Sequence, residues 1–533
     1  MYNENGPMSI IVQGAALVCF TWSCIIVTVQ TIGIFKLFRN HSAPLPKPVS
    51  PTLLKDIPHI TIIRPVKGVE AGLYECLAST FRLAYPKSKL TIFLCVDSTT
   101  DPAYPILRKL VEDFPEFDAQ VLVEEQDPVL HGHGGHINNL GPNPKIRNIS
   151  RAYREARPDS AIWIVDCNVW VSPYSAGRMV DKLYGFQANG ARTTPYKFVH
   201  QLPLVVDIEA PRTSEQQTLL PTGARAELSH AQSPRGILDY GGRLEEMFMA
   251  TTHAKFYSAI NTVGIAPCIV GKSNMFRKAH LETLTDPAQN PILSAADSSR
   301  GRGIDFFSSY ICEDHLIGDL IWRSKIDGYK NHGLVFGEVA IQPVSGMPVA
   351  AYIARRVRWL RVRKWTVLTA TLVEPGVESL VASLHLAFAM TTLPWVYGPL
   401  GIPPTWHAMG AIWFSAVTTW MVVDRWVSGK LHKLQSVEVD EHTPYFAVGS
   451  IRRGGIKRRP FFTWFFAWLG RELLAFPIWA WAVLFGATVA WRGNKFRVRM
   501  DMSVVEIDSG RKSRPLTPIT ANGERPCSKD RVD

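Results

Sequence analysis

Three long stretches without charged side chains constrain the fold of this chain most strongly. No residue from Asn5 to Phe35 carries a formal charge, and the same holds for Leu473 to Trp491. The stretch from Ser379 to Val423 is interrupted only by two histidines. An apolar helix of about 20 residues is long enough to cross the hydrocarbon core of a bilayer. The sequence therefore predicts an integral membrane protein with apolar segments on both sides of a large water-soluble segment.

The overall composition excludes two other classes of protein. Aromatic residues make up 11% of the chain, which is too many for a mainly disordered protein. Lys and Arg exceed Asp and Glu by 12 charges, as 58 − 46 = 12. Beside apolar spans, we expect this basic excess to contact anionic lipid headgroups. Membrane lipids are therefore expected partners, and nucleic acid is not.

The flanks of the apolar stretches predict the domain organisation. Residues 1–40 read as a transmembrane signal anchor, and Lys36 and Arg39 directly after it place the following segment in the cytosol. Residues 41–365 form the expected cytosolic domain. Interfacial helices and a C-terminal transmembrane region are predicted for residues 366–510, with a disordered basic tail over residues 511–533.

Strand-like and helix-like patterns alternate in the first part of the cytosolic segment. The predicted strands cover residues 59–69, 89–98, 119–125 and 160–169, and the predicted helices cover residues 72–86, 102–113 and 145–157. This alternation predicts an α/β domain with a mostly parallel, doubly wound sheet. Residues 207–242 and 285–303 lack clear periodicity, and we expect them to be mobile insertions.

Several acidic side chains are predicted at one edge of this sheet. Asp97 ends the second strand, Asp101 follows four residues later, and Asp166 ends the fourth strand. Ligands bind beyond the carboxyl ends of the strands in such sheets. Lys145, at the start of a predicted helix, is well placed to bind a phosphate there. These residues predict a binding site for a phosphorylated ligand.

Two further motifs follow later in the chain. Asp314 lies at the start of a helical run in "ICEDHLIGDL", beside Glu313. Arg355, Arg358 and Trp359 form an R-x-x-R-W motif. The two arginines are three residues apart and share a helix face, and guanidinium groups suit diphosphate oxygens. In isolation these motifs are also typical of a helix cap and of an interfacial anchor.

In this order, Asp166, Asp314 and the R-x-x-R-W motif resemble the conserved residue pattern of membrane-bound inverting glycosyltransferases with the A-type, Rossmann-like fold. The stretches "RPVKGVE", "CVDSTTDPA", "NPKIRN", "IWIVDCNVWV", "TTHAKFY", "CEDHLIGDLI" and "RRVRWLRVRKW" are similar to ceramide glucosyltransferases. The resemblance implies transfer of glucose from UDP-glucose to the primary hydroxyl of ceramide with inversion, giving β-glucosylceramide. It also implies a location in the Golgi or the endoplasmic reticulum.

The resemblance implies roles for individual residues. Asp166 would hold Mg²⁺ or Mn²⁺ against the diphosphate, although Asn168 stands where a D-x-D motif has its second aspartate. Asp314 would be the general base for the ceramide hydroxyl. His253, in "TTHAKFY", matches a histidine of the family's active site.

Some alternatives stay open at the level of sequence. Asp101 matches the family's first aspartate and Asp97 suits the strand end better, so either is a candidate for contacting the uridine or ribose. A processive polysaccharide synthase or a polyprenyl-phosphate sugar transferase is an alternative function, and a non-catalytic membrane lipid-binding protein is a more distant one. The sequence indicates no oligomeric state.

Overall fold

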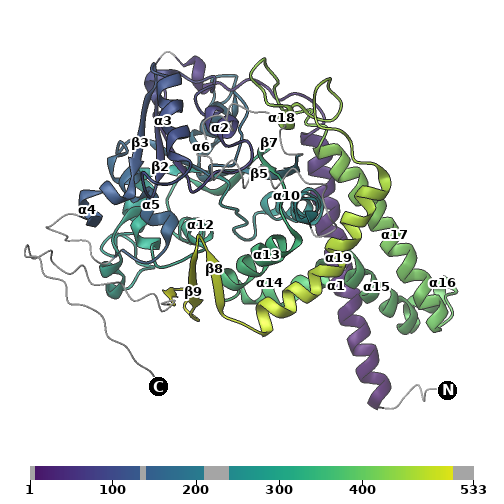
Figure 1. Ribbon diagram of the computed structural model, residues 1–533. Coiled ribbons are helices and arrows are strands. Elements are labelled where there is room, and N and C mark those ends of the chain that lie inside the picture. Colours follow the sequence, from purple (N-terminus) through teal and green to yellow (C-terminus); the bar gives the residue numbers. More distant parts are fainter. Residues whose placement is uncertain (1–6, 54, 132–139, 209–238, 508–533) are drawn as a thin grey trace, which may run out of the picture.

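A mixed sheet forms the centre of the molecule (Figure 1). The computed structural model describes residues 7–53, 55–131, 140–208 and 239–507, and within them seven strands form this sheet in the order β3-β2-β1-β4-β6-β5-β7. These strands are β1 (Ile60–Pro65), β2 (Leu90–Val96), β3 (Asp118–Val123), β4 (Ala161–Val165), β5 (Tyr196–Asp207), β6 (Ser273–Arg277) and β7 (Lys330–Val344). All neighbouring pairs are parallel except those of β6, which runs antiparallel to β4 and β5. The mostly parallel α/β sheet predicted from the sequence is confirmed.

Helices cover both faces of the sheet because successive strand residues point to opposite sides. On one face, Ile60 and Ile62 pack against α2 (Leu73–Ala78), α3 (Tyr104–Asp113) and α6 (Ser175–Tyr184). On the other face, Ile63 and Ile164 pack against α5 (Pro144–Glu155), α11 (Lys278–Leu284) and α12 (Glu313–Arg323). The result is a three-layered α/β/α domain. The short helix α4 (Pro128–His131) lies at its periphery in Figure 1.

The predicted elements of the first part of the domain lie where the sequence pattern put them, but the strands expected over residues 59–69 and 160–169 end at Pro65 and Val165, and one helix is shorter than expected. The helix expected over residues 72–86 ends at Ala78. Beyond it, Phe81, Leu83 and Tyr85 are buried in the core from a turning segment. Their apolar spacing reflects packing under the sheet and does not indicate further helical turns.

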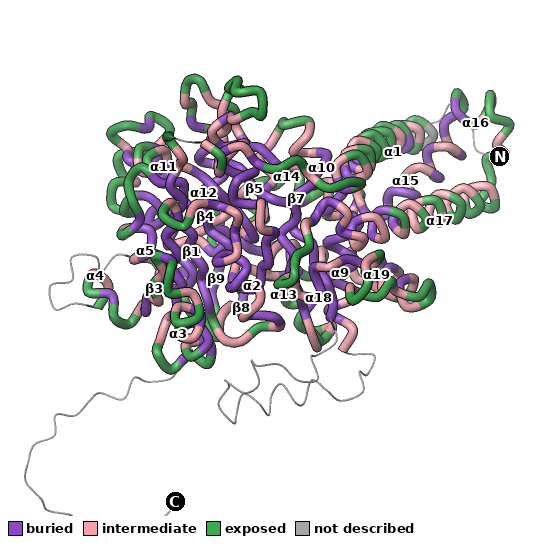
Figure 2. Tube along the Cα trace, turned by 90° about the horizontal axis from the view of Figure 1, so that it is seen from above, coloured by how far each residue is buried: buried purple, intermediate pink, exposed green. Residues whose placement is uncertain are grey.

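A long N-terminal helix extends away from this domain (Figures 1 and 2). Helix α1 (Pro7–Asn40) has 34 residues and is about 51 Å long at 1.5 Å per residue. Ile10, Ile11 and Val18 on its surface are each more than 65% exposed. Of the described helices, α1 by itself passes a length and hydropathy test for a membrane span. A lipid environment accounts for these exposed apolar side chains, which supports membrane association.

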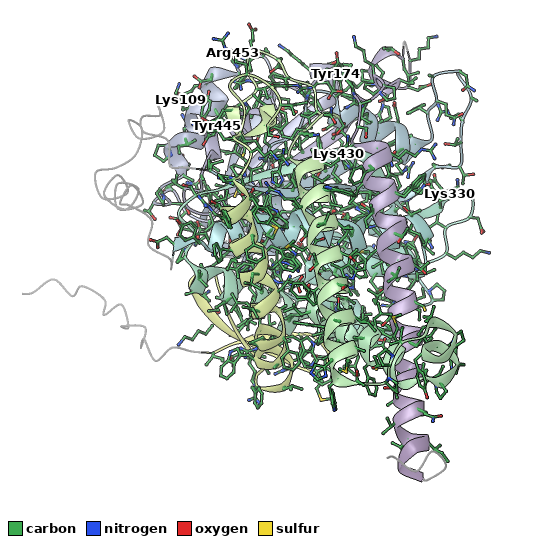
Figure 3. All side chains as sticks on the ribbon, turned by 90° about the vertical axis from the view of Figure 1, so that its right-hand side faces the viewer. Lys109, Tyr174, Lys330, Lys430, Tyr445 and Arg453 are labelled. Atoms are coloured by element: carbon green, nitrogen blue, oxygen red, sulfur yellow. The ribbon has the colours of Figure 1, made fainter. Side chains whose placement is uncertain are left out.

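The apolar segment that begins at Ser379 is folded into three helices. It consists of α15 (Ser379–Thr392), α16 (Pro394–Leu400) and α17 (Trp406–Leu431). Helix α15 passes the span test only together with residues 368–377, across a bend of 79°. Helix α15 packs against α1 and α17, and Figure 3 shows α1 and α17 side by side with Lys430 at one end of α17. Tyr445, which opens α18 (Tyr445–Val448), and Arg453 lie at that same end.

The third apolar stretch, Leu473–Trp491, is not one helix. Helix α19 (Phe461–Leu484) supplies its first part, and β8 (Thr488–Trp491) its last. Helix α19 buries Arg471 and Glu472 against the rest of the molecule, while Phe462 and Phe466 remain exposed. After α19, β8 pairs with β9 (Asn494–Val498), which pairs with β10 (Val504–Glu506) in a small antiparallel sheet. Thr488 and Val489 are β-branched residues, which suit this strand better than a helix.

The structure describes the two predicted insertions and the predicted tail to different extents. Residues 209–238 of the first insertion and residues 508–533 of the tail lie outside the described residues. The second insertion, residues 285–303, contains a 3₁₀ helix (Ala295–Arg300) that begins with a capping box between Ser294 and Asp297. It is therefore a structured segment, which continues into a second 3₁₀ helix (Gly303–Phe307) beside α5.

Candidate active site

A cavity of about 490 Å³ opens at the edge of the sheet where β1 and β4 end. Its lining includes residues from the loop after β1, the start of α5, the end of β4, the start of β6 and the start of α12. Two elements from the C-terminal part of the chain close it: α13 (Val349–Arg363) and the turn between β8 and β9. The position agrees with the general rule for ligand sites in open α/β sheets.

The reversed strand β6 brings a second chain segment to this edge. Because β6 is antiparallel to β4, the residues that precede β6 lie beside those that follow β4. The amide N–H of Asp166 donates to the carbonyl of Lys272 at 3.1 Å. Gly271 and Lys272 therefore line the cavity beside Asp166, although they are more than 100 residues away in the chain.

Two lysines hold the carboxylate of Asp166. Lys145 Nζ lies 3.1 Å from one carboxylate oxygen, and Lys272 Nζ lies 2.9 Å from the other. Burial by itself raises the pKa of Asp166, but the two ammonium groups outweigh it and hold that pKa well below its ordinary value. Asp166 is thus an anion at all physiological pH values.

The start of α5 is tied to the start of α12. The side chain of Asn143 caps α5 by accepting from the N–H groups of Lys145 and Ile146, and its amide donates to Glu313 at 3.1 Å. Glu313 also lies 3.1 Å from Lys145 Nζ. Glu313 is therefore engaged in holding the two helix starts together, and its neighbour Asp314 lines the same cavity.

Asp314 has the properties of a general base. Burial and the nearby negative charge of Asp166 raise its pKa above that of an ordinary aspartate, while Lys145 lowers it in part. A carboxylate with a raised pKa is a stronger base and accepts a proton more readily. Asp314 lies against the backbone of Gly271, which leaves its carboxylate little room to move.

Helix α13 brings the R-x-x-R-W motif to the cavity. Arg355 Nε lies 3.1 Å from a carboxylate oxygen of Glu245, a fully buried residue of α9 (Gly241–Phe248). Arg358 forms no ion pair or hydrogen bond with the described part of the chain. Burial, together with Arg355 and Arg492, lowers the pKa of Arg358 to about 10. Trp359 packs beside Phe248 and lines the cavity together with the two arginines.

Three of the predicted site residues do not line the cavity. Asp97 forms an ion pair with Lys67, and Asp101 accepts from the N–H of Gly68 at 3.0 Å. Both aspartates thus brace the loop after β1, of which Lys67 itself lines the cavity. Their predicted contact with the nucleotide stays a prediction.

His253 also lies away from the cavity lining. It ends a π-helical segment (Met249–His253) between α9 and α10 (Ala254–Val263), where its ring stacks on Tyr257 at 5.1 Å. Burial, with smaller effects from Arg356 and Arg363, lowers its pKa to about 3, so the ring is neutral. Its predicted catalytic role stays a prediction.

Sequence reasoning missed four residues that the fold brings to the site. They are Glu245, Lys272, Trp491 and Arg492. Trp491 ends the third apolar stretch of the sequence, and Arg492 follows directly after it. No local pattern marks Glu245 or Lys272 as site residues, because their partners are distant in the chain.

The oxygen donors beside Asp166 fit a hard divalent cation. The buried Oδ1 atom of Asn168 has no hydrogen-bond partner within the described residues, while its amide donates to Glu70. Mg²⁺ usually takes one or two protein carboxylates and completes its coordination with phosphate oxygens and water. No group of three or more His, Cys, Asp or Glu side chains within the described part of the chain is arranged to hold a metal ion. The residues therefore fit a cation that is shared with a bound diphosphate.

The sequence profile of glycosyl transferase family 21 matches residues 16–211 and 289–504. The chain belongs to this family. It is 56% identical to a ceramide glucosyltransferase of Pyricularia oryzae, covering 95% of this chain and 98% of that one. The corresponding enzyme of Gibberella zeae is 50% identical over 96% and 98% of the two chains, and that of Candida albicans is 32% identical over 84% and 88%. The resemblance noticed in the sequence is confirmed.

Among solved structures, a mannosyltransferase from Pyrobaculum calidifontis in complex with GDP-Man and Mn²⁺ aligns with a TM-score of 0.36 and 14% identity, over 79% of this chain and 98% of that one.

Proposed function

We propose that this glycosyltransferase transfers glucose from UDP-glucose to the primary hydroxyl of ceramide with inversion, giving β-glucosylceramide. The single observation that carries the proposal is the cavity that Asp314 lines together with Asp166, Lys145 and Arg358, an arginine without an ion-pair partner within the described residues. A base and a diphosphate-binding group of cations are the two parts that such a transfer needs. The names of the relatives support the choice of ceramide and glucose.

The reaction is a single displacement at the anomeric carbon. The ceramide oxygen bonds to C1 of glucose as the bond between C1 and the UDP oxygen breaks, and the hydroxyl proton passes to Asp314. Attack on the face opposite UDP converts an α-linked donor into a β-glucoside. The raised pKa of Asp314 matches its role because a more basic carboxylate takes the proton more effectively.

Negative charge that develops on UDP is neutralised at the other end of the cavity. We assign this role to Arg355 and Arg358, since guanidinium groups form paired hydrogen bonds with phosphate oxygens. A Mg²⁺ or Mn²⁺ ion held by Asp166 would supply further charge stabilisation at the diphosphate. Lys145 keeps Asp166 ionised and correctly placed for this role.

The lipid acceptor is proposed to enter from the side of α13. This helix leads directly into α14 (Leu368–Val373), on which Leu368, Leu372 and Val373 are exposed. An exposed apolar helix next to the cavity suits contact with the membrane interface. We further propose that the catalytic domain faces the cytosol of the Golgi or the endoplasmic reticulum, because Lys36 and Arg39 follow the apolar part of α1.

A transfer assay in lipid nanodiscs tests the proposal. Ceramide is offered with UDP-glucose, UDP-galactose or UDP-N-acetylglucosamine, using wild-type protein and Asp314→Asn. The expected product is β-glucosylceramide, at a rate that falls by about 10²–10⁴-fold in the variant. Transfer to a different lipid would overturn the assigned acceptor. A wild-type rate in Asp314→Asn would remove Asp314 as the base.

A further inference from the structure

The turn between β8 and β9 brings an arginine into the cavity from the far end of the chain. Trp491 and Arg492, at this turn, line the same cavity as Asp166, Asp314 and Arg358. Arg358 lies 5.9 Å from the centre of the Trp491 ring, and Arg492 lies 5.5 Å from it. The Trp491 ring is therefore a shared neighbour of two guanidinium groups.

The small C-terminal sheet is fixed to the two helices that carry the catalytic motifs. Val489, Phe496 and Val504 pack in one apolar cluster with Ile311 and Cys312, which directly precede α12. The N–H of Val504 donates to the carbonyl of Ser309 at 2.8 Å. These contacts hold the β8–β9 turn at a fixed position relative to the start of α12, and hence relative to Asp314.

On the other side, the sheet is fixed to α13. Arg361 donates to the carbonyl of Thr488 at 2.6 Å, and Val362 belongs to the same apolar cluster as Val489. The small sheet that carries the turn is therefore held by α12 and α13 together.

Arg492 is one of two arginines in the cavity lining without a carboxylate partner. Among the other lining cations, Lys67 is paired with Asp97, Lys145 and Lys272 with Asp166, Arg355 with Glu245, and Arg363 with Glu374. Within the described residues, Arg358 and Arg492 form neither an ion pair nor a hydrogen bond. Two adjacent guanidinium groups without a direct carboxylate partner in a cavity suit an anionic ligand, because each can form paired hydrogen bonds with phosphate oxygens.

The backbone conformation at Arg492 is unfavourable for an arginine, which supports a functional role for its side chain. Its φ angle is 51°, in the left-handed region that non-glycine residues seldom occupy, and Gly493 follows with φ of 90°. Glycine or asparagine is favoured at the first of two such positions in a tight hairpin turn. An arginine is retained here despite this backbone cost, and its side chain lies in the cavity lining.

We propose that Arg492 binds the diphosphate of the nucleotide-sugar donor together with Arg358, its neighbour at the Trp491 ring. The inference rests on the proposed function, because it assigns the anion as the donor's diphosphate. It makes the C-terminal β8–β9 turn part of the donor site of this enzyme.

The test compares UDP binding to full-length protein in lipid nanodiscs by isothermal titration calorimetry. Arg492→Gly removes the guanidinium and suits the left-handed backbone, so folding is favoured. Arg492→Lys keeps the charge without the paired hydrogen-bond donors. Arg497→Ala is the matched control, because Arg497 is an exposed arginine of β9 outside the cavity lining. The melting temperature of each unliganded variant accompanies the titration.

We expect Arg492→Gly to raise the Kd for UDP by about tenfold to a hundredfold, which is the usual cost of losing a charged hydrogen bond. Arg492→Lys should fall between wild type and Arg492→Gly, while Arg497→Ala binds UDP normally. The KM for UDP-glucose should rise in Arg492→Gly with little change in the KM for ceramide. Melting temperatures should stay at or above the wild-type value.

Two results overturn the inference and remain distinguishable. If wild-type protein binds UDP and Arg492→Gly binds it equally well, Arg492 does not contact the diphosphate and the proposed function is untouched. If wild-type protein itself does not bind UDP, the proposed function fails and the assignment of Arg492 fails with it.

Discussion

Gly271 and Asp314 are in direct contact: a Cβ atom at position 271 would stand 2.7 Å from Oδ2 of Asp314 and 3.1 Å from its Cβ. Both distances are shorter than van der Waals contact between such atoms allows. The segment before β6 thus packs directly against the side chain of the proposed base. It restricts the carboxylate to the side that faces the cavity.

Gly271→Ala should therefore reduce catalysis more than stability. The new methyl group displaces the carboxylate of Asp314, and a misplacement of about 1 Å can reduce the rate by about 100-fold. We expect kcat to fall by this order while the Kd for UDP and the melting temperature stay near wild type. Gly410→Ala is the control, since a Cβ there meets no atom within 4 Å. A wild-type kcat in Gly271→Ala would show that the position of Asp314 is unimportant.

The pH dependence of turnover should report the charge of Lys145. The proposed base must be ionised, so activity is lost as pH falls through the raised pKa of Asp314. Lys145 lowers this pKa, while Asp166 raises it. Lys145→Met should therefore move the acidic limb of the kcat/KM profile to higher pH. Lys272→Met leaves Lys145 in place and should move it less, because Lys272 pairs with Asp166.

The profiles are measured between about pH 4 and pH 9, with the melting temperature recorded at each pH. This separates loss of the base from unfolding. An acidic limb that stays in place in Lys145→Met would contradict the assignment of Asp314.

Asp166→Asn should separate metal-dependent from metal-independent donor binding. In the variant, Lys272 loses its carboxylate partner and becomes available to phosphate oxygens, while Lys145 keeps its ion pair with Glu313. We expect the Kd for UDP in EDTA to be unchanged or lower than in wild type. The gain in UDP affinity on adding Mn²⁺ should be lost, because the cation loses its carboxylate.

The exposed pair Arg157–Asp159 provides the matched control for this experiment. Asp159→Asn should keep the wild-type response to Mn²⁺. If Asp166→Asn retains the full gain in UDP affinity on adding Mn²⁺, Asp166 is not the metal ligand.

Arg358 and Arg361 lie on the same helix, but their substitution by alanine should have different effects. Arg361 donates to the carbonyls of Trp481, Ala482 and Thr488, so Arg361→Ala leaves these groups without their donor. We expect it to reduce the free energy of unfolding by about 2–4 kcal/mol. Arg358→Ala should instead weaken UDP binding at a near-normal melting temperature, as thermal unfolding and titration will show. The reverse result would make Arg358 a structural residue.

The strands and helices of the first half of the domain were predictable because their signals are local. The burial of β1 and β4 and the amphipathic spacing of α3 and α5 are properties of neighbouring residues. The sequence also placed Asp166 at a strand end, Asp314 at a helix start, and Arg355, Arg358 and Trp359 on one helix. Those placements follow from secondary structure alone, and the α/β fold class followed from them.

The tertiary structure decided which of these residues share a cavity. It brought Gly271 and Lys272 to Asp166 through the reversed strand β6, and Arg492 through a turn near the end of the chain. It left His253 outside the cavity lining. It also divided the last apolar stretch between a helix and a strand. The sequence by itself determined the local elements and the chemistry they carry; contacts between distant segments, which have no local signature, decided the composition of the site.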